Sequence, residues 1–121
     1  MSSVLVVDDD IRLLQAIQIR LESLGYTVMT AQDAYHALAM TVRSHPDLIV
    51  LDVNLPAGNG FGIEQRLHEI DELSNTPVIY MTGESPDSID APVRLSHARA
   101  VHYKPFRFDD LAASIIEVLG R

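Results

Sequence analysis

Short apolar runs alternate with segments of helical periodicity along the whole chain. The runs predict five strands at Val4–Val7, Thr27–Thr30, Leu48–Leu51, Val78–Met81 and Ala100–Tyr103. Uninterrupted Val, Ile and Leu are typical of parallel strands covered on both faces. We therefore predict an α/β fold with one five-stranded parallel sheet, doubly wound with five helices. Thr27–Thr30 alternates polar and apolar residues, which indicates an edge strand.

Four of the intervening segments carry apolar residues at three- and four-residue spacing, as amphipathic helices do. The expected buried faces are Leu14, Ile17, Leu21 and Leu24; Ala34, Leu38 and Val42; Ile63, Leu67 and Ile70; and Leu111, Ile115 and Leu119. Asp10 and Asp33 are expected to cap the first two helices, and Gly25 to end the first. The segment Ser85–Ser96 contains Pro86 and Pro92, so its helix should be the least regular.

Length and charge restrict the class of protein. A chain of 121 residues fits one domain, residues 1–121. The formal net charge of -8 argues against nucleic-acid contact, because phosphates would be repelled. The chain has no cysteine, no apolar run long enough for a membrane span and no secretory leader pattern, so we expect a cytoplasmic protein without membrane contact.

Acidic residues follow two of the apolar runs directly. Asp8 and Asp9 come after Val4–Val7, and Asp52 comes after Leu48–Leu51. Carboxyl ends of neighbouring parallel strands meet at one edge of the sheet, so these three carboxylates should converge. Like charges that close repel unless a cation lies among them. The sequence therefore predicts a site for a hard cation, with Mg²⁺ as the expected ion.

The next two strands end in Thr82 and Lys104, which adds a hydroxyl and an ammonium to the same edge. A carboxylate nucleophile, a metal, and donors for the equatorial phosphoryl oxygens are the parts that phosphoryl transfer requires. Each residue alone has an ordinary explanation as a strand end or turn residue. Their joint occurrence favours phosphoryl transfer.

The chain resembles the receiver domain of two-component response regulators, the CheY-like fold, over essentially its whole length. The resemblance rests on Asp8-Asp9, on Asp52 with Asn54, Pro56 and Gly60, on Thr82-Gly83, on Ala98, and on Lys104-Pro105-Phe106. It implies the strand order 2-1-3-4-5 and a cis Lys104–Pro105 peptide bond. Only about 5–6% of X–Pro bonds in folded proteins are cis, so that implication is specific.

The resemblance also implies a role for each site residue. Asp52 would accept the phosphoryl group, and Asp8, Asp9, Asp52 and the backbone carbonyl of Asn54 would bind Mg²⁺. Thr82 and Lys104 would hold phosphoryl oxygens, and Glu84 and Asn54 would flank the phosphate. The implied partners are a sensor histidine kinase or phosphotransfer protein, an output domain or protein, and a second copy of the chain after phosphorylation. The domain would act as a switch rather than as an enzyme that turns over an external substrate.

Three positions depart from the family pattern. His97 stands where receivers usually have glycine, Val101 where they usually have an aromatic switch residue, and Pro92 within the expected fourth helix. Tyr103 lies two residues beyond Val101 and, by strand periodicity, on the same face. These departures concern the expected output surface rather than the phosphorylation pocket. The five histidines show no metal-ligand spacing, and we expect them at the surface.

Three alternatives differ in kind. A phosphatase of the haloacid-dehalogenase type also uses aspartate, magnesium, threonine and lysine. Such enzymes carry an Asp-x-Asp pattern on the first strand, whereas here Asp52 is on the third strand and Asn54 stands two residues beyond it. A degenerate receiver would only dock partners without being phosphorylated. Retention of all five site residues argues against this alternative; they are Asp8, Asp9, Asp52, Thr82 and Lys104. A nucleotide-binding Rossmann domain is disfavoured because acids rather than glycines follow the first strand.

Overall fold

The structure is a computed structural model. It describes residues 2–55, 58–59, 62, 65–66, 69, 75–84 and 98–120. The expected third helix around Ile63, Leu67 and Ile70 and the expected irregular helix within 85–96 fall largely or wholly outside these residues, as do Pro56, Gly60, Pro92 and His97.

All five predicted strands are present and form one parallel sheet. They are β1 (Ser3–Val7), β2 (Thr27–Ala31), β3 (Leu48–Asp52), β6 (Val78–Thr82) and β7 (Ala100–Tyr103). The sheet order is β2-β1-β3-β6-β7, and every neighbouring pair is parallel. This confirms the predicted fold class and strand order, with β2 at one edge. Two short strands that the sequence did not predict, β4 (Asn54–Leu55) and β5 (Gly58–Asn59), form a separate antiparallel pair after β3.

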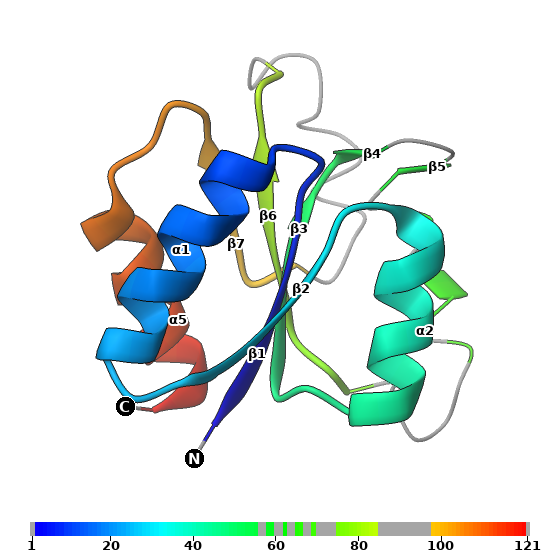
Figure 1. Ribbon diagram of the computed structural model, residues 1–121, viewed down its shortest axis with the longest axis horizontal. Helices are drawn as coiled ribbons and strands as arrows, with labels where there is room; N and C mark the ends of the chain where they lie inside the picture. Colours follow the sequence, from blue (N-terminus) through cyan, green and yellow to red (C-terminus); the bar gives the residue numbers. More distant parts are fainter. Residues whose placement is uncertain are drawn as a thin grey trace.

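Helices cover both faces of the sheet. Figure 1 shows α1 (Ile11–Ser23) and α5 (Phe108–Leu119) side by side on one face and α2 (Ala34–Ser44) on the other. The central strands β3 and β6 are buried at every residue, which explains their uninterrupted apolar sequence. Among the described residues, no helix is both long enough and apolar enough to cross a bilayer.

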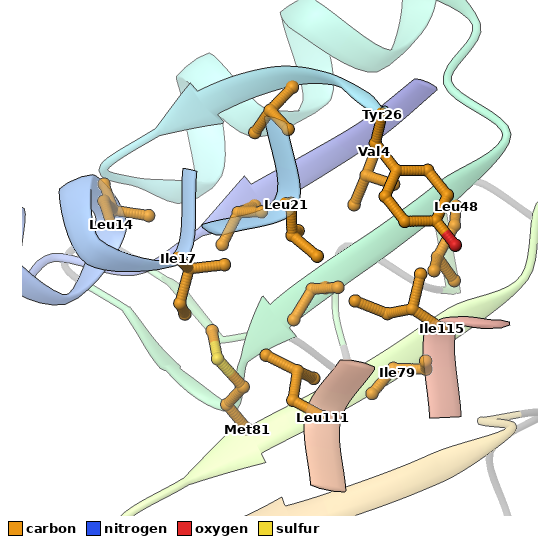
Figure 2. Close-up of a cluster of buried hydrophobic side chains, with 13 residues drawn as sticks. Val4, Leu14, Ile17, Leu21, Tyr26, Leu48, Ile79, Met81, Leu111 and Ile115 are labelled. Carbon is orange, nitrogen blue, oxygen red and sulfur yellow. The ribbon is translucent and has the colours of Figure 1, made fainter. Parts of the chain in front are cut away.

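Each sheet face has its own hydrophobic core. Figure 2 shows the first core, in which Leu14, Ile17 and Leu21 of α1 meet Leu111 and Ile115 of α5 over the sheet. The second core lies on the α2 side and contains alternate residues of the same strands, such as Leu5, Ile49 and Tyr80. Strand residues therefore alternate between two apolar layers, and the polar strand ends are left as the sites of chemistry.

Helix α1 begins and ends largely as predicted. The Asp10 side chain accepts hydrogen bonds from the backbone amides of Arg12 and Leu13, at 3.1 and 3.2 Å, and so caps the helix. Leu24 is the C-cap and Gly25 follows with a φ of 97°. The prediction that Leu24 is buried was wrong, because at the C-cap it leaves the helical face and is 46% exposed.

Helix α2 has the predicted Asp33 cap but a different buried centre. Ala37 and Thr41 are the buried residues, whereas Val42 is 48% exposed. The Thr41 hydroxyl donates to the Ala37 carbonyl oxygen at 2.7 Å, so this polar side chain is satisfied inside the core. Of the predicted residues, Ala34 and Leu38 are partly buried against the same core, and the prediction was wrong at Val42. At the other end of the helix, His45 is the C-cap in the left-handed conformation, with a φ of 47°.

Helix α5 carries the strongest amphipathic pattern and follows the prediction. Leu111 and Ile115 are fully buried, and Leu119 is partly buried against the same core. Gly120 closes the helix in the left-handed conformation, and its amide donates to the Ile116 carbonyl oxygen at 2.7 Å. Ala100 of β7, the strand whose last residue precedes Lys104, packs against the same core as Leu111 and Ile115.

Candidate phosphorylation site

The register of the sheet brings the acids together. Val7 of β1 is paired with Leu51 of β3, so the residues that follow them, Asp8 and Asp52, lie side by side at the carboxyl edge. One carboxylate oxygen from each of Asp8, Asp9 and Asp52 lies within 4.8 Å of the other two. Asp8 is completely buried and Asp52 is 4% exposed, whereas Asp9 faces solvent. The predicted convergence of three carboxylates is present.

The Asp8 carboxylate is fixed from two directions. Its Oδ1 accepts the backbone amide of Asp10 at 2.9 Å, and its Oδ2 accepts the Lys104 ammonium at 2.7 Å. The Asp8 backbone amide donates to the Ala31 carbonyl oxygen of β2 at 3.1 Å. A buried carboxylate needs such partners, because a charge without them would be costly to bury. These partners hold the Asp8 carboxylate in one orientation.

The Asp52 carboxylate is held in the same manner. Its Oδ1 accepts the Asn54 backbone amide at 3.0 Å, and its Oδ2 accepts the Lys104 ammonium at 3.1 Å. Asn54 itself is exposed at the start of β4. The side chain of Asp52 thus has a defined orientation at the carboxyl edge of the sheet, which a nucleophile at this position would require.

Lys104 connects the two buried acids. Burial alone would lower the pKa of Lys104, but the hydrogen bonds and negative charges of Asp8 and Asp52 outweigh this effect and raise the pKa above its ordinary value of 10.5. Lys104 is therefore ionised at neutral pH. One ammonium offsets only one of the three carboxylates, so the cluster keeps a net negative charge that suits a divalent cation.

Thr82 ends the strand next to β3 and is completely buried. Its hydroxyl oxygen accepts the Glu84 backbone amide at 3.0 Å, and its carbonyl oxygen accepts the Lys104 backbone amide at 2.6 Å. The Lys104–Pro105 peptide bond is cis, as the resemblance implied. Thr82 and Lys104 are thus connected through the backbone, and the turn after β6 is tied to the Thr82 side chain.

Val101 departs from the family pattern, and Tyr103 is the aromatic residue two positions beyond it on β7. In the register of β6 and β7, Val101 is paired with Tyr80 and Tyr103 with Thr82. Val101 is partly buried against the core that contains Tyr80, a residue with no exposed surface. The aromatic residue paired with Thr82 is therefore Tyr103 of the neighbouring strand β7.

One histidine was misjudged from the sequence. His102 is half-buried between β7 and α5, and its Nε2 lies 2.8 Å from the Ser114 hydroxyl oxygen. Its ring also contacts the Phe106 ring, with centroids 5.9 Å apart. Burial lowers the pKa of His102 below its ordinary value of 6.5, and the charge of Asp110 offsets part of this effect. Side chains alternate between the two sheet faces along β7, which puts His102 on the α5 side. This alternation was the signal in the sequence that could have indicated its burial.

We expect His102 to make stability depend on mildly acidic pH. Its folded-state pKa is depressed, so its contribution is present above about pH 6.5 and is lost as the pH falls through the lower folded value. His102→Gln keeps a hydrogen-bonding group but cannot titrate. Urea unfolding from about pH 7 to about pH 5 should therefore show a smaller loss of free energy for His102→Gln than for the unchanged chain. Parallel curves for the two proteins would contradict the assignment.

Comparison with known proteins agrees with this geometry. A family model described as the response regulator receiver domain matches residues 4–116. The chain belongs to the response regulator receiver domains. Membership decides against the haloacid-dehalogenase and Rossmann alternatives, since it accounts for the order of elements as well as for the acids. A receiver domain is a signalling switch of two-component systems.

Similar receiver domains are known as structures and as parts of longer regulators. The response regulator CheY4 of Vibrio cholerae is 32% identical, with a TM-score of 0.88 and 98% coverage of both chains. A probable transcriptional regulator, ycf27, from Cyanophora paradoxa is 37% identical over 98% of this chain and 48% of its own length. The DNA-binding dual master transcriptional regulator RpaA of Synechocystis is 34% identical over all of this chain and 50% of its own length. The chain therefore spans about half the length of these curated relatives.

Proposed function

We propose that Asp52 accepts a phosphoryl group from a phosphohistidine on a sensor histidine kinase or phosphotransfer protein. The observation that carries the proposal is the junction of Asp8, Asp9 and Asp52 with the bridging Lys104 ammonium. Phosphoryl transfer needs an oriented oxygen nucleophile together with positive charge around the equatorial oxygens. The acid cluster fits Mg²⁺, which Asp8, Asp9, Asp52 and the Asn54 backbone carbonyl would hold and which would supply most of that positive charge.

The residues of the chain have separate tasks in this transfer. An Asp52 oxygen forms the new O–P bond, while the P–N bond of the donor breaks and the imidazole nitrogen keeps the electron pair. The Asn54 amide holds the other oxygen of the carboxylate in place. Lys104 then moves from a carboxylate oxygen to a phosphoryl oxygen, where it keeps an ionic partner throughout.

The switch begins at Thr82. We propose that its hydroxyl bonds a phosphoryl oxygen after transfer and moves relative to the Glu84 amide, which now donates to that hydroxyl. The acyl phosphate would thereby favour one of two conformations of the turn after β6. Valine at position 101 has a stiff, short side chain and cannot swing as an aromatic ring does. Displacement of the turn itself, or of Tyr103, is the proposed route to the surface.

The response would reach an output domain or a separate output protein. Two relatives are named as transcriptional regulators and are about twice the length of this chain, which supports an output on DNA in proteins of this kind. We propose that the acidic receiver domain itself makes no nucleic-acid contact, that it can pair with a second copy after phosphorylation, and that the exchange takes place in the cytoplasm.

Incubation with acetyl phosphate and Mg²⁺ should add one phosphoryl group to the chain without any kinase, because the pocket itself supplies the nucleophile and the oxygen ligands. Intact-protein mass spectrometry measures the product. Chelation of Mg²⁺ should stop the reaction. An unmodified chain under conditions where a control receiver reacts would contradict the proposal and would favour a receiver that only docks partners.

A further inference from the structure

An exposed aromatic residue, Tyr35, lies in the first turn of α2. Tyr35 is 78% exposed, more than any other large hydrophobic residue in the described part of the chain. Its ring makes an edge contact with the His36 ring, with centroids 5.5 Å apart and an interplanar angle of 89°. Such edge-to-face contacts stabilise one orientation of the two rings. Tyr35 is therefore presented to solvent in a supported position.

The support continues to Asp33. His36 Nδ1 lies 2.7 and 2.8 Å from the two oxygens of the Asp33 carboxylate, and the His36 backbone amide donates to the same carboxylate at 2.8 Å. The backbone and side-chain hydrogen bonds from His36 lower the pKa of Asp33, so this carboxylate is ionised. We call Asp33, Tyr35 and His36 the Tyr35 patch. A surface that is ordered before a partner arrives loses less entropy on binding.

A cavity lies beside the patch. Its volume is about 330 Å³, and it is lined by Thr30, Ala31, Gln32, Asp33, His36 and Met40. Apolar surface from Ala31 and Met40 faces polar groups from Asp33 and His36, a combination that suits one amphipathic side chain of a partner.

The cavity lies at the end of the strand that neighbours β1, which leads into Asp8. Ala31 lines the cavity, and its carbonyl oxygen accepts the Asp8 amide at 3.1 Å. Strands β2, β1 and β3 are neighbours in that order, and neighbouring strands lie about 4.8 Å apart, which places the end of β2 about 10 Å from that of β3. A protein that brings a phosphohistidine to Asp52 would therefore come close to the end of β2, where Thr30 and Ala31 line the cavity.

We propose that the Tyr35 patch and its cavity form a docking point for the protein that donates the phosphoryl group. The proposal rests on the proposed function. The donor would place an apolar side chain against Tyr35 and cationic side chains near Asp33 and the exposed acids Asp9 and Asp10. The net charge of -8 favours such a cationic partner. A single aromatic residue and a small cavity are too little surface for a stable dimer of the chain alone.

The test compares a protein donor with a small donor. The protein donor is the kinase that transfers fastest to the unchanged chain within a panel of purified, autophosphorylated sensor kinases. The small donor is phosphoramidate, which carries the same P–N bond but touches only the pocket. Tyr35→Ala removes the ring, Tyr35→Phe keeps it, and Ile19→Ala is the matched control. Ile19 is an apolar residue of α1 that is 67% exposed. It lies about 12 Å along the helix from Ile11, the first helical residue after the acids of the site.

Tyr35→Ala should slow transfer from the kinase at least about tenfold through a higher KM, because exposed aromatic anchors are frequent hot spots. Its reaction with phosphoramidate should match that of the unchanged chain. Tyr35→Phe and Ile19→Ala should behave normally with both donors. Equal kinase transfer in Tyr35→Ala, or equal slowing with both donors, would overturn the docking proposal. The docking proposal would also be overturned if the unchanged chain reacted with phosphoramidate but with none of the kinases. If the chain reacted with neither donor, the proposed function itself would be contradicted.

Discussion

Asp52→Asn should abolish phosphorylation by acetyl phosphate while leaving the fold intact. The amide cannot act as the oxygen nucleophile. Of the three clustered carboxylates, Asp52 combines a bond to Lys104 with some exposed surface, whereas Asp9 faces solvent. Asp8 is completely buried and shares its Oδ2 with Lys104. Intact-protein mass spectrometry should therefore show no phosphoryl addition to the variant.

The stability of Asp52→Asn should stay within about 1 kcal/mol of that of the unchanged chain, measured by urea unfolding. The change removes one of two hydrogen-bonded carboxylate oxygens but also relieves repulsion between Asp52 and Asp8. Asp109→Asn is a suitable control, since Asp109 has an exposed side chain. It should be phosphorylated normally. Phosphorylated Asp52→Asn protein would sink the assignment of the acceptor.

Lys104→Met should destabilise the metal-free protein by about 2–3 kcal/mol at neutral pH. Removing one partner of a buried ion pair usually costs about 3–5 kcal/mol, and the partial exposure of Lys104 reduces that figure. The loss follows because the ammonium is bonded to two carboxylates that are 0% and 4% exposed. Methionine has a similar length, so packing changes little.

Mg²⁺ should raise the unfolding free energy of Lys104→Met more than that of the unchanged chain, because the ion takes over the neutralisation of Asp8 and Asp52. Arg107→Ala provides the contrast. Arg107 pairs with Asp109 at 3.8 Å with both side chains exposed, and its loss should cost less than about 1 kcal/mol. Equal effects of the two substitutions, or no added gain from Mg²⁺, would show that Lys104 does not hold the acid cluster together.

The sheet could be predicted because its signal is local and repeated. Each strand is a run of apolar residues, and burial on both faces leaves little freedom for other residue types. The structure extends three of these runs by one polar residue or alanine at the carboxyl end, namely Ala31, Asp52 and Thr82. Two of the three additions, Asp52 and Thr82, belong to the site, because a polar residue at a strand end falls outside the apolar pattern.

Side-chain partners could not be predicted to the same extent. The position of Lys104 at the sheet edge followed from topology, but its bonds to both Asp8 and Asp52 depend on the conformation of a long, flexible side chain. On α2 the predicted residues Ala34 and Leu38 do pack against the core, but Thr41 was missed because it satisfies its hydroxyl within the helix, which composition does not reveal. The pair β4 and β5 was missed because two-residue strands carry no periodic signal.

The central claim is that Asp52 is the phosphoryl acceptor. The most direct measurement treats the acetyl phosphate product with borohydride, which reduces the acyl phosphate of an aspartate to homoserine, and then locates the reduced residue by peptide mass spectrometry. We predict homoserine at position 52 alone, in amounts that depend on Mg²⁺. Modification at Asp8 or Asp9, or a phosphoryl group that resists borohydride and lies on a histidine such as His36, would contradict the account.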